Sequence, residues 1–130
     1  MSQFNPTEGE LAILRVLWRK GEPATVHDVH AELVKTKHTA YTTVLKMLTI
    51  MNEKGLVLRD ESGRKHRYVP LCSESAVQLT MLKGLVKNVF SGSAFKLMQS
   101  ALGDDQATEE ELDEVSRLIA QAKARRAKER

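Results

Sequence analysis

The 130-residue sequence predicts a mainly α-helical protein with one small β-hairpin. Two observations favour this fold class. Apolar residues recur at helical spacing over most of the chain, and a segment from residue 56 to 69 interrupts them with short runs rich in β-forming residues. The chain length allows one compact domain, or one small domain with an appendage that does not fold alone.

Three helices are predicted in the first 55 residues. Thr7 and Glu10 make a capping-box pattern before the first helix, which we expect to end at Gly21. Thr25 with Asp28 at the third helical position starts the second helix. The apolar stripe of the first helix is Leu11, Leu14, Leu17 and Trp18, and that of the second, which runs to about Lys37, is Val26, Val29, Leu33 and Val34.

The third helix is expected to start at a Thr39 cap and to stop at Gly55. Helical spacing assigns five apolar or aromatic residues to its inner side, namely Tyr41, Val44, Leu45, Leu48 and Met51. Its outer side carries short polar and basic residues, namely Thr42, Thr43, Lys46 and Thr49. The sequence therefore predicts an amphipathic helix whose exposed face is able to donate hydrogen bonds.

The period changes after the third helix. Residues 56–59 and 66–69 are expected to form two strands joined by a polar, basic loop, and Pro70 is expected to close the hairpin. Three helices followed by a hairpin within some 65 residues is the order of a winged helix-turn-helix module. In such modules the third helix enters the major groove of DNA and the hairpin contacts the backbone.

Three more helices are expected in the remainder of the chain, over residues 74–90, 93–102 and 108–128. We divide the chain into a winged helix-turn-helix DNA-binding domain, residues 1–72, and a helical dimerisation domain, residues 73–130. A segment of about 55 residues does not easily bury so many apolar side chains alone, so we expect them to pack against a second copy. The expected interface consists of Leu82, Leu85, Val89, Phe95, Met98, Leu112, Val115 and Ile119. The alternative is a monomer in which the tail, residues 73–130, packs on the head, residues 1–72, of the same chain.

Charge is distributed unevenly along the chain, although the formal net charge is only +3. Residues 35–67 contain eight basic and three acidic side chains, residues 104–114 contain seven acids and no base, and residues 122–130 are basic. The residues that we expect to bind DNA are Tyr41, Thr42, Thr43, Lys46, Arg64, Lys65 and Arg67. For Tyr41 a core position is an equal alternative, and for the three hairpin cations the alternative is a solvated loop charge.

Other classes of protein find little support. No apolar run is long enough to span a membrane, and residues 1–7 lack the pattern of a secretory signal, so we expect a cytoplasmic protein. Cys72 is the only cysteine, which excludes an internal disulfide and favours a buried, inert thiol. His27 and His30 lie one helical turn apart but lack further ligands at suitable spacing, so we expect no metal site. No catalytic constellation and no cofactor motif is present, and we expect no enzymatic activity.

Four segments resemble the penicillinase repressor family. They are Leu11 to Trp18, Ala40-Tyr41-Thr42-Thr43-Val44, Glu53-Lys54-Gly55-Leu56-Val57 and Arg67-Tyr68-Val69-Pro70. That family includes repressors of β-lactamase and methicillin-resistance genes and copper-responsive repressors of copper-transport operons. The resemblance covers roughly Pro6 to Leu118, nearly the whole chain.

The resemblance implies a homodimeric transcriptional repressor that binds a palindromic operator in double-stranded DNA and regulates a resistance or stress-related operon. In the antibiotic branch of the family, a membrane sensor-protease system leads to cleavage in the tail; in the copper branch, cysteine clusters near the C-terminus bind metal. This chain has no such cluster, which favours the β-lactamase type. The Asn-Phe cleavage site of the antibiotic branch aligns with Ser100-Ala101, and this departure leaves proteolytic induction open.

Two other functions remain as alternatives. Some winged-helix domains are protein–protein interaction modules, and that function predicts that Thr43 and Lys46 are dispensable and that salt has little effect on binding. A metal or redox sensor based on Cys72 and a nearby histidine predicts that a chelator or thiol oxidant changes DNA binding.

Overall fold

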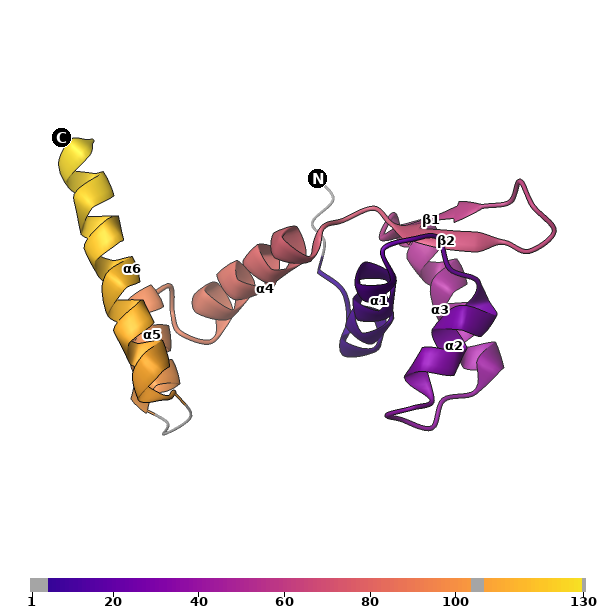
Figure 1. Cartoon of the computed structure of the whole chain (residues 1–130), viewed down its shortest axis with the longest axis horizontal. Coiled ribbons are helices and arrows are strands. Elements are labelled where there is room, and N and C mark those ends of the chain that lie inside the picture. The colour runs from indigo at the N-terminus through magenta and orange to yellow at the C-terminus, as the bar shows by residue number, and fades with distance from the viewer. Residues whose placement is uncertain (1–4, 104–106, 130) are drawn as a thin grey trace. The chain divides into compact units, whose positions relative to one another are not determined.

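The computed structural model describes residues 5–103 and 107–129 and contains six helices and one hairpin within them (Figure 1). In chain order the elements are α1 (Glu8–Lys20), α2 (Val26–Leu33), α3 (Tyr41–Lys54), β1 (Val57–Asp60), β2 (Arg67–Pro70), α4 (Glu74–Asn88), α5 (Ala94–Gly103) and α6 (Glu109–Lys128). The predicted fold class is confirmed. The chain forms two compact units, Met1–Gly84 and Leu85–Arg130, so that α4 begins in the first and ends in the second.

Local capping interactions set most helix ends as predicted. The capping boxes Thr7/Glu10 and Thr25/Asp28 are both formed, with reciprocal side-chain to backbone hydrogen bonds. Gly21 and Gly55 end α1 and α3 in the left-handed backbone conformation, at φ of 68° and 82°, which a glycine adopts without steric cost. These termini depend only on residues within four positions of each other, and pattern analysis therefore predicts them.

Two expectations about the segment between α2 and α3 were wrong. α2 ends at Leu33 rather than near Lys37, because the next amides bond to carbonyls in tighter turns, such as the Lys35 amide to the Glu32 carbonyl. Thr39 does not cap α3. Its hydroxyl donates to the Lys37 carbonyl, and Ala40 occupies the cap position of α3 without a side-chain hydrogen bond.

The hairpin is antiparallel, and each strand begins one residue later than expected. Arg59 pairs with Tyr68 in the register, and Pro70 pairs with Val57 inside β2 rather than closing the hairpin. A further bridge joins Ala24 to Tyr68 by two backbone hydrogen bonds of 3.1 and 2.7 Å. The segment before α2 is thereby held against the inner strand of the hairpin.

One core holds the first unit together. It combines Ile13, Leu14 and Leu17 of α1 with apolar side chains from every other element of the unit, namely Val29, Val44, Leu48, Met51, Leu56, Val57, Tyr68, Cys72 and Val77. Val77 belongs to α4 and is completely buried. The indole Nε1 of Trp18 donates to the Cys72 carbonyl at 2.9 Å, which fixes the chain between β2 and α4.

A buried carboxylate joins the start of α1 to the end of α3. Glu10 is 5% exposed, and its two oxygens accept from the Thr7 amide at 2.9 Å and from Lys54 Nζ at 2.7 Å. Burial opposes the charge of Glu10, but the hydrogen bonds from Lys54 and Thr7 outweigh burial and lower its pKa. Glu10 therefore stabilises the folded state while it is ionised.

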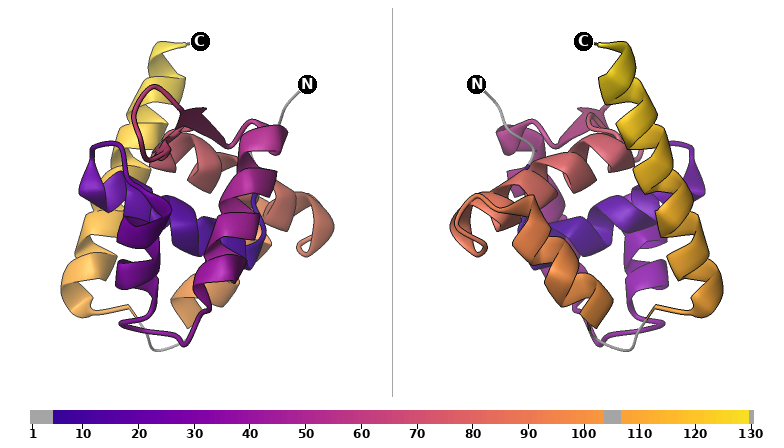
Figure 2. Two further views of the ribbon diagram at one scale, coloured as in Figure 1. Left: turned by 90° about the vertical axis from the view of Figure 1, so that its right-hand side faces the viewer. Right: turned by 90° about the vertical axis from the view of Figure 1, so that its left-hand side faces the viewer.

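The second unit contains the end of α4, α5 and α6, seen from two sides in Figure 2. Thr108 caps α6 in a third capping box with Glu111, as the predicted start of this helix requires. Among the described residues from Leu85 onward, no side chain is fully buried. This unit thus exposes apolar side chains that a soluble domain ordinarily covers.

The pair of Glu10 and Lys54 predicts a pH-dependent contribution to stability. We expect Glu10→Gln to lower the free energy of unfolding at pH 7 by about 1 kcal/mol, because the amide retains the cap but loses the ion pair, which half-exposed Lys54 leaves partly screened. A carboxylate whose pKa is lowered by folding stabilises above its unfolded pKa and loses this effect as pH falls.

Urea denaturation of the parent and the variant at pH 7 and pH 3 measures the effect, and the difference should shrink at pH 3. Glu8→Gln is the matched control, since Glu8 lies exposed in the same turn. An equal loss for both variants at pH 7 would contradict the assignment.

Candidate nucleic-acid interface

The two faces of α3 differ sharply in burial. Val44, Leu48 and Met51 are completely buried. The side chains of Thr42, Thr43 and Lys46 are all exposed and follow the outer side of the same helix. The buried face fixes the helix, so its hydroxyl and ammonium groups are presented to solvent from a rigid element, as recognition of a nucleic-acid groove requires.

The start of α3 is held by His30 of α2. His30 Nε2 lies 2.8 Å from the Thr39 carbonyl oxygen, and its ring meets the ring of Tyr41 edge to face, with centroids 5.6 Å apart and an interplanar angle of 74°. Tyr41 is 46% exposed, so the structure places it at the surface against His30 rather than in the core. It lies on the same helix as Thr42, Thr43 and Lys46 and next to them.

The hairpin, which we call the wing (residues 57–70), carries the other predicted cations. Glu61 Oε2 lies 3.6 Å from Arg59 Nε, and Glu61 Oε1 lies 3.7 Å from His66 Nε2. Asp60 accepts from the Ser62 amide, which lowers the pKa of its carboxyl group, and pairs in register with Arg67. Arg64 and Lys65 are exposed and form no ion pair within the part of the chain that the structure describes.

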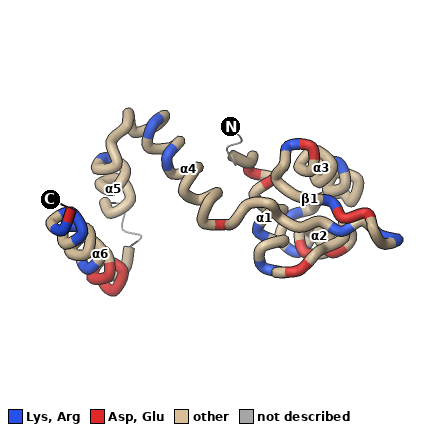
Figure 3. The backbone as a smooth tube through the Cα atoms, turned by 90° about the horizontal axis from the view of Figure 1, so that it is seen from above, with Lys and Arg blue, Asp and Glu red and all other residues tan. Residues whose placement is uncertain are grey.

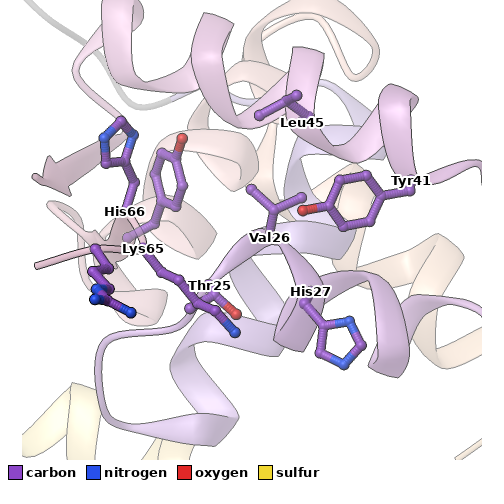
Figure 4. Close-up of a pocket in the computed structure, with 9 residues that line it drawn as sticks. Thr25, Val26, His27, Tyr41, Leu45, Lys65 and His66 are labelled. Atoms are coloured by element: carbon purple, nitrogen blue, oxygen red, sulfur yellow. The ribbon is translucent and has the colours of Figure 1, made fainter.

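α2, α3 and the wing border an open hollow of about 450 Å³, shown in Figure 4. We call it the wing hollow. It is lined by Thr25, Val26, His27, Tyr41, Leu45, Arg64, Lys65, His66 and Tyr68. Apolar and aromatic groups from the helices and cationic groups from the wing thus border one space. The hollow brings Tyr41 together with Arg64 and Lys65, which the sequence placed far apart, whereas Arg67 does not line it.

The prediction that Leu45 lies on the inner side of α3 was wrong. Helical spacing assigned it to the inner side of α3, but it is 43% exposed and lines the wing hollow. The buried stripe of α3 is narrow and consists of Val44, Leu48 and Met51, which join the core of the first unit. Leu45 follows Val44 directly and stands at the edge of that stripe, and spacing alone does not resolve such edge positions.

The figures also show where charge gathers. In Figure 3 basic residues occur at the tip of the wing, and within α6 acidic residues gather in the first turn while basic residues follow toward the C-terminus. The acids of α6 lie at the helix N-terminus and the cations at its C-terminus, where each interacts favourably with the helix dipole. The exposed side chains of Ser100 and Ala101 lie on α5.

The residues weighed as metal ligands or redox groups are His27, His30 and Cys72. No group of three or more potential metal ligands occurs in the described part of the chain. Cys72 is 5% exposed, and burial raises the pKa of its thiol. Within residues 5–103 and 107–129, no helix has the length and hydropathy needed to cross a membrane.

Comparisons with known proteins point to one family. The model of the penicillinase repressor family matches residues 6–121. The transcriptional regulator BlaI of Mycobacterium tuberculosis strain H37Rv is 34% identical over 118 residues, which are 88% of this chain and 83% of that protein. The penicillinase repressor of Bacillus licheniformis is 25% identical over 120 residues, covering 92% of this chain and 93% of its own.

A solved structure extends the likeness to the fold. The DNA-binding domain of the repressor BlaI, determined in solution, is 28% identical to this chain with a TM-score of 0.50, and the match covers 58% of this chain and 90% of that one. It confirms the winged helix-turn-helix architecture predicted for the head.

The burial of Cys72 predicts that its thiol is unreactive in the folded protein. We expect labelling by a disulfide reagent such as 5,5′-dithiobis(2-nitrobenzoate) to be at least about 100-fold slower in buffer than in denaturant, because the thiolate is disfavoured and the sulfur is covered. Absorbance of the released thiolate measures the rate. Rapid labelling of native protein would contradict the prediction and favour a redox sensor.

Proposed function

The chain belongs to the penicillinase repressor family of transcriptional repressors, and on this premise we propose that it represses transcription by binding operator DNA through α3 and the wing. The single observation that carries the proposal is the outer face of α3, where Thr42, Thr43 and Lys46 stand exposed on a helix with a fully buried opposite face. The DNA-binding domain of BlaI, as its name states, binds DNA, and its fold matches the head of this chain.

The two parts of the interface have different tasks in this proposal. Thr42, Thr43 and Lys46 contact base edges in the major groove, since hydroxyl groups donate or accept there and lysine reaches the acceptors of guanine. Tyr41 contacts the sugar-phosphate backbone of the DNA through its hydroxyl group. Arg64, Lys65 and, more weakly, Arg67 contact phosphates, which adds affinity and salt dependence without selecting a sequence.

We further propose that the repressor is a homodimer held together by its helical tail, residues 73–130. Seven of the eight expected interface residues have large exposed apolar side chains, namely Leu82, Leu85, Val89, Phe95, Met98, Leu112 and Ile119. The eighth, Val115, is half-buried. A two-fold dimer covers the same apolar surface on both copies, which removes it from water without any further domain.

The proposed mechanism is steric. A dimer on a palindromic operator places two copies of α3 about one turn of DNA apart, roughly 34–36 Å, and blocks polymerase at the promoter. Two linked heads bind more tightly than one because the second binds at a raised effective concentration. An event that separates the tails therefore ends repression without changing a base contact.

The regulated genes are proposed to be resistance or stress genes of the β-lactamase type. The repressor itself is proposed to be cytoplasmic. Cys72 is the one cysteine of the chain and is buried, so the copper-binding clusters that the copper branch requires have no counterpart. Cleavage by a membrane sensor-protease system would act on the exposed segment of α5 around Ser100 and Ala101, which lacks the Asn-Phe pair. The proposal assigns the chain no enzymatic role and no cofactor.

Base-contacting and phosphate-contacting residues are separable by titration. In a fluorescence anisotropy titration of DNA from the promoter region, we expect Thr43→Ala and Lys46→Ala each to weaken operator binding by about 1–3 kcal/mol and to reduce selectivity over a random duplex. We expect Arg64→Ala and Lys65→Ala to weaken both duplexes alike and to lower the salt slope by about 1 each.

Lys83→Ala is the matched control, because Lys83 is an exposed lysine on α4, outside the proposed DNA-binding surface. Measurements at two salt concentrations separate the two groups of variants. Binding of the unaltered protein that does not exceed its binding to a random duplex would refute the DNA proposal and favour a protein-interaction module.

The tail predicts the oligomeric state. We expect sedimentation equilibrium of the parent to give twice the chain mass of 14.6 kDa. The side chain of Phe95 is 69% exposed, and we expect Phe95→Glu to give a monomer because it places a charge in the dimer interface. The variant should bind a half-operator as the parent does and a full operator more weakly. Leu79→Glu, at an exposed leucine outside the expected interface, should remain a dimer. A monomeric parent would contradict the proposal.

A further inference from the structure

An apolar patch lies beside the polar face of α3. Tyr41 and Leu45, one turn apart, are 46% and 43% exposed and line the wing hollow together with Val26 at the start of α2. Figure 4 shows the three side chains around the same space. We call these three residues the apolar patch.

The apolar patch differs from an ordinary exposed leucine in where it stands. Single apolar residues on a surface are common and need no function. Leu45, however, precedes Lys46 directly, and both Tyr41 and Leu45 border the exposed face that carries Thr42 and Lys46. The patch also shares its hollow with Arg64 and Lys65 of the wing. A DNA strand whose phosphates meet these cations therefore passes next to the patch.

One polar group beside Leu45 on α3 already has a partner within the helix. The hydroxyl of Thr49, one turn further along α3, donates to the Leu45 carbonyl at 2.9 Å and so is occupied by the helix itself. Burial of about 0.8 kcal/mol per methyl-sized group is the available driving force on this side of the helix. The exposed side chains of Tyr41 and Leu45 accordingly offer a contact for an apolar group on this side of α3.

One apolar group is displayed on base edges in the major groove, the C5-methyl group of thymine. We propose that Leu45 and the ring of Tyr41 form a contact site for a thymine methyl group of the operator, and that Leu45 is a specificity-determining residue. This inference rests on the proposed function, because it requires α3 to lie in the major groove. It adds a sequence preference that does not depend on the hydrogen bonds of Thr43 or Lys46.

Deoxyuridine tests the contact, since it lacks only the methyl group of thymidine. The full-length protein is titrated against duplexes of the operator segment that it protects in footprinting, with one thymine replaced by deoxyuracil in each duplex. At one or more positions in each half-site, we expect the substitution to weaken binding of the parent about fourfold, the loss that corresponds to one buried methyl group. At those positions the same substitution should leave the affinity of Leu45→Ala unchanged.

Two variants and a matched control make the result specific. Tyr41→Phe keeps the ring and loses the hydroxyl, so it should retain the deoxyuracil effect even where its overall affinity falls. Leu71→Ala removes an equally exposed leucine that does not line the wing hollow, and it should also retain the effect. Thermal unfolding by circular dichroism verifies that Leu45→Ala is folded.

The possible outcomes are distinct. Loss of the deoxyuracil effect in Leu45→Ala alone supports the contact site. Deoxyuracil effects that are absent at every position, or that are equal in the parent and in Leu45→Ala, overturn it while leaving the repressor function intact. Failure of the parent to protect any operator segment overturns both the proposed function and this inference.

Discussion

The burial of one face of α3 is the constraint on which the rest of the head depends. Val44, Leu48 and Met51 have no exposure, and they join a core with Ile13 and Leu17 of α1. Any rotation of α3 about its axis would bring these side chains into water, at a cost of about 1.5–3 kcal/mol for each large one fully exposed. The rotation of the helix is thus set by its inner face, and the direction of Thr42 and Lys46 follows from that setting.

The position of the wing relative to α3 depends on a second set of contacts. Tyr68 is 1% exposed, its amide and its carbonyl both bond to Ala24, and it pairs in register with Arg59 of β1. The wing is therefore anchored at its base, while Arg64 and Lys65 lie exposed in the loop that joins its two strands. This combination places exposed cations beside α3, which suits contact with the phosphates of DNA.

In the proposed function, the helical tail controls how tightly the repressor binds operator DNA, although the tail has little buried core of its own. None of the described side chains from Leu85 onward is fully buried within one chain, whereas the head has a complete core of its own. In the proposed dimer the tail draws its stability from association, so its state depends on protein concentration and on any cleavage. In this proposal the head keeps its own core in either case, and regulation acts on the link between two heads rather than on the interface with DNA.

The sequence by itself determined the features that depend on near neighbours. The capping boxes of α1 and α2, the glycine ends of α1 and α3, the order of helices and hairpin, and the polar outer face of α3 follow from patterns within a few residues. The residues of the candidate interface at Thr42, Thr43 and Lys46 were accessible in this way. The division into a head, residues 1–72, and a tail, residues 73–130, stays a prediction, and Val77 of α4 lies in the core of the first unit.

Only the tertiary structure decided the features that join distant residues. Glu10 and Lys54 are 44 positions apart, and no local pattern pairs them. Whether Leu45 is covered depends on how wide a sector of α3 its neighbours α2 and β1 occupy, and the capping of α3 depends on whether Thr39 turns toward Lys37 or toward the helix. Periodicity records which way a side chain points from its own helix. It does not record what stands opposite, because that is set by the packing of elements far apart in the chain.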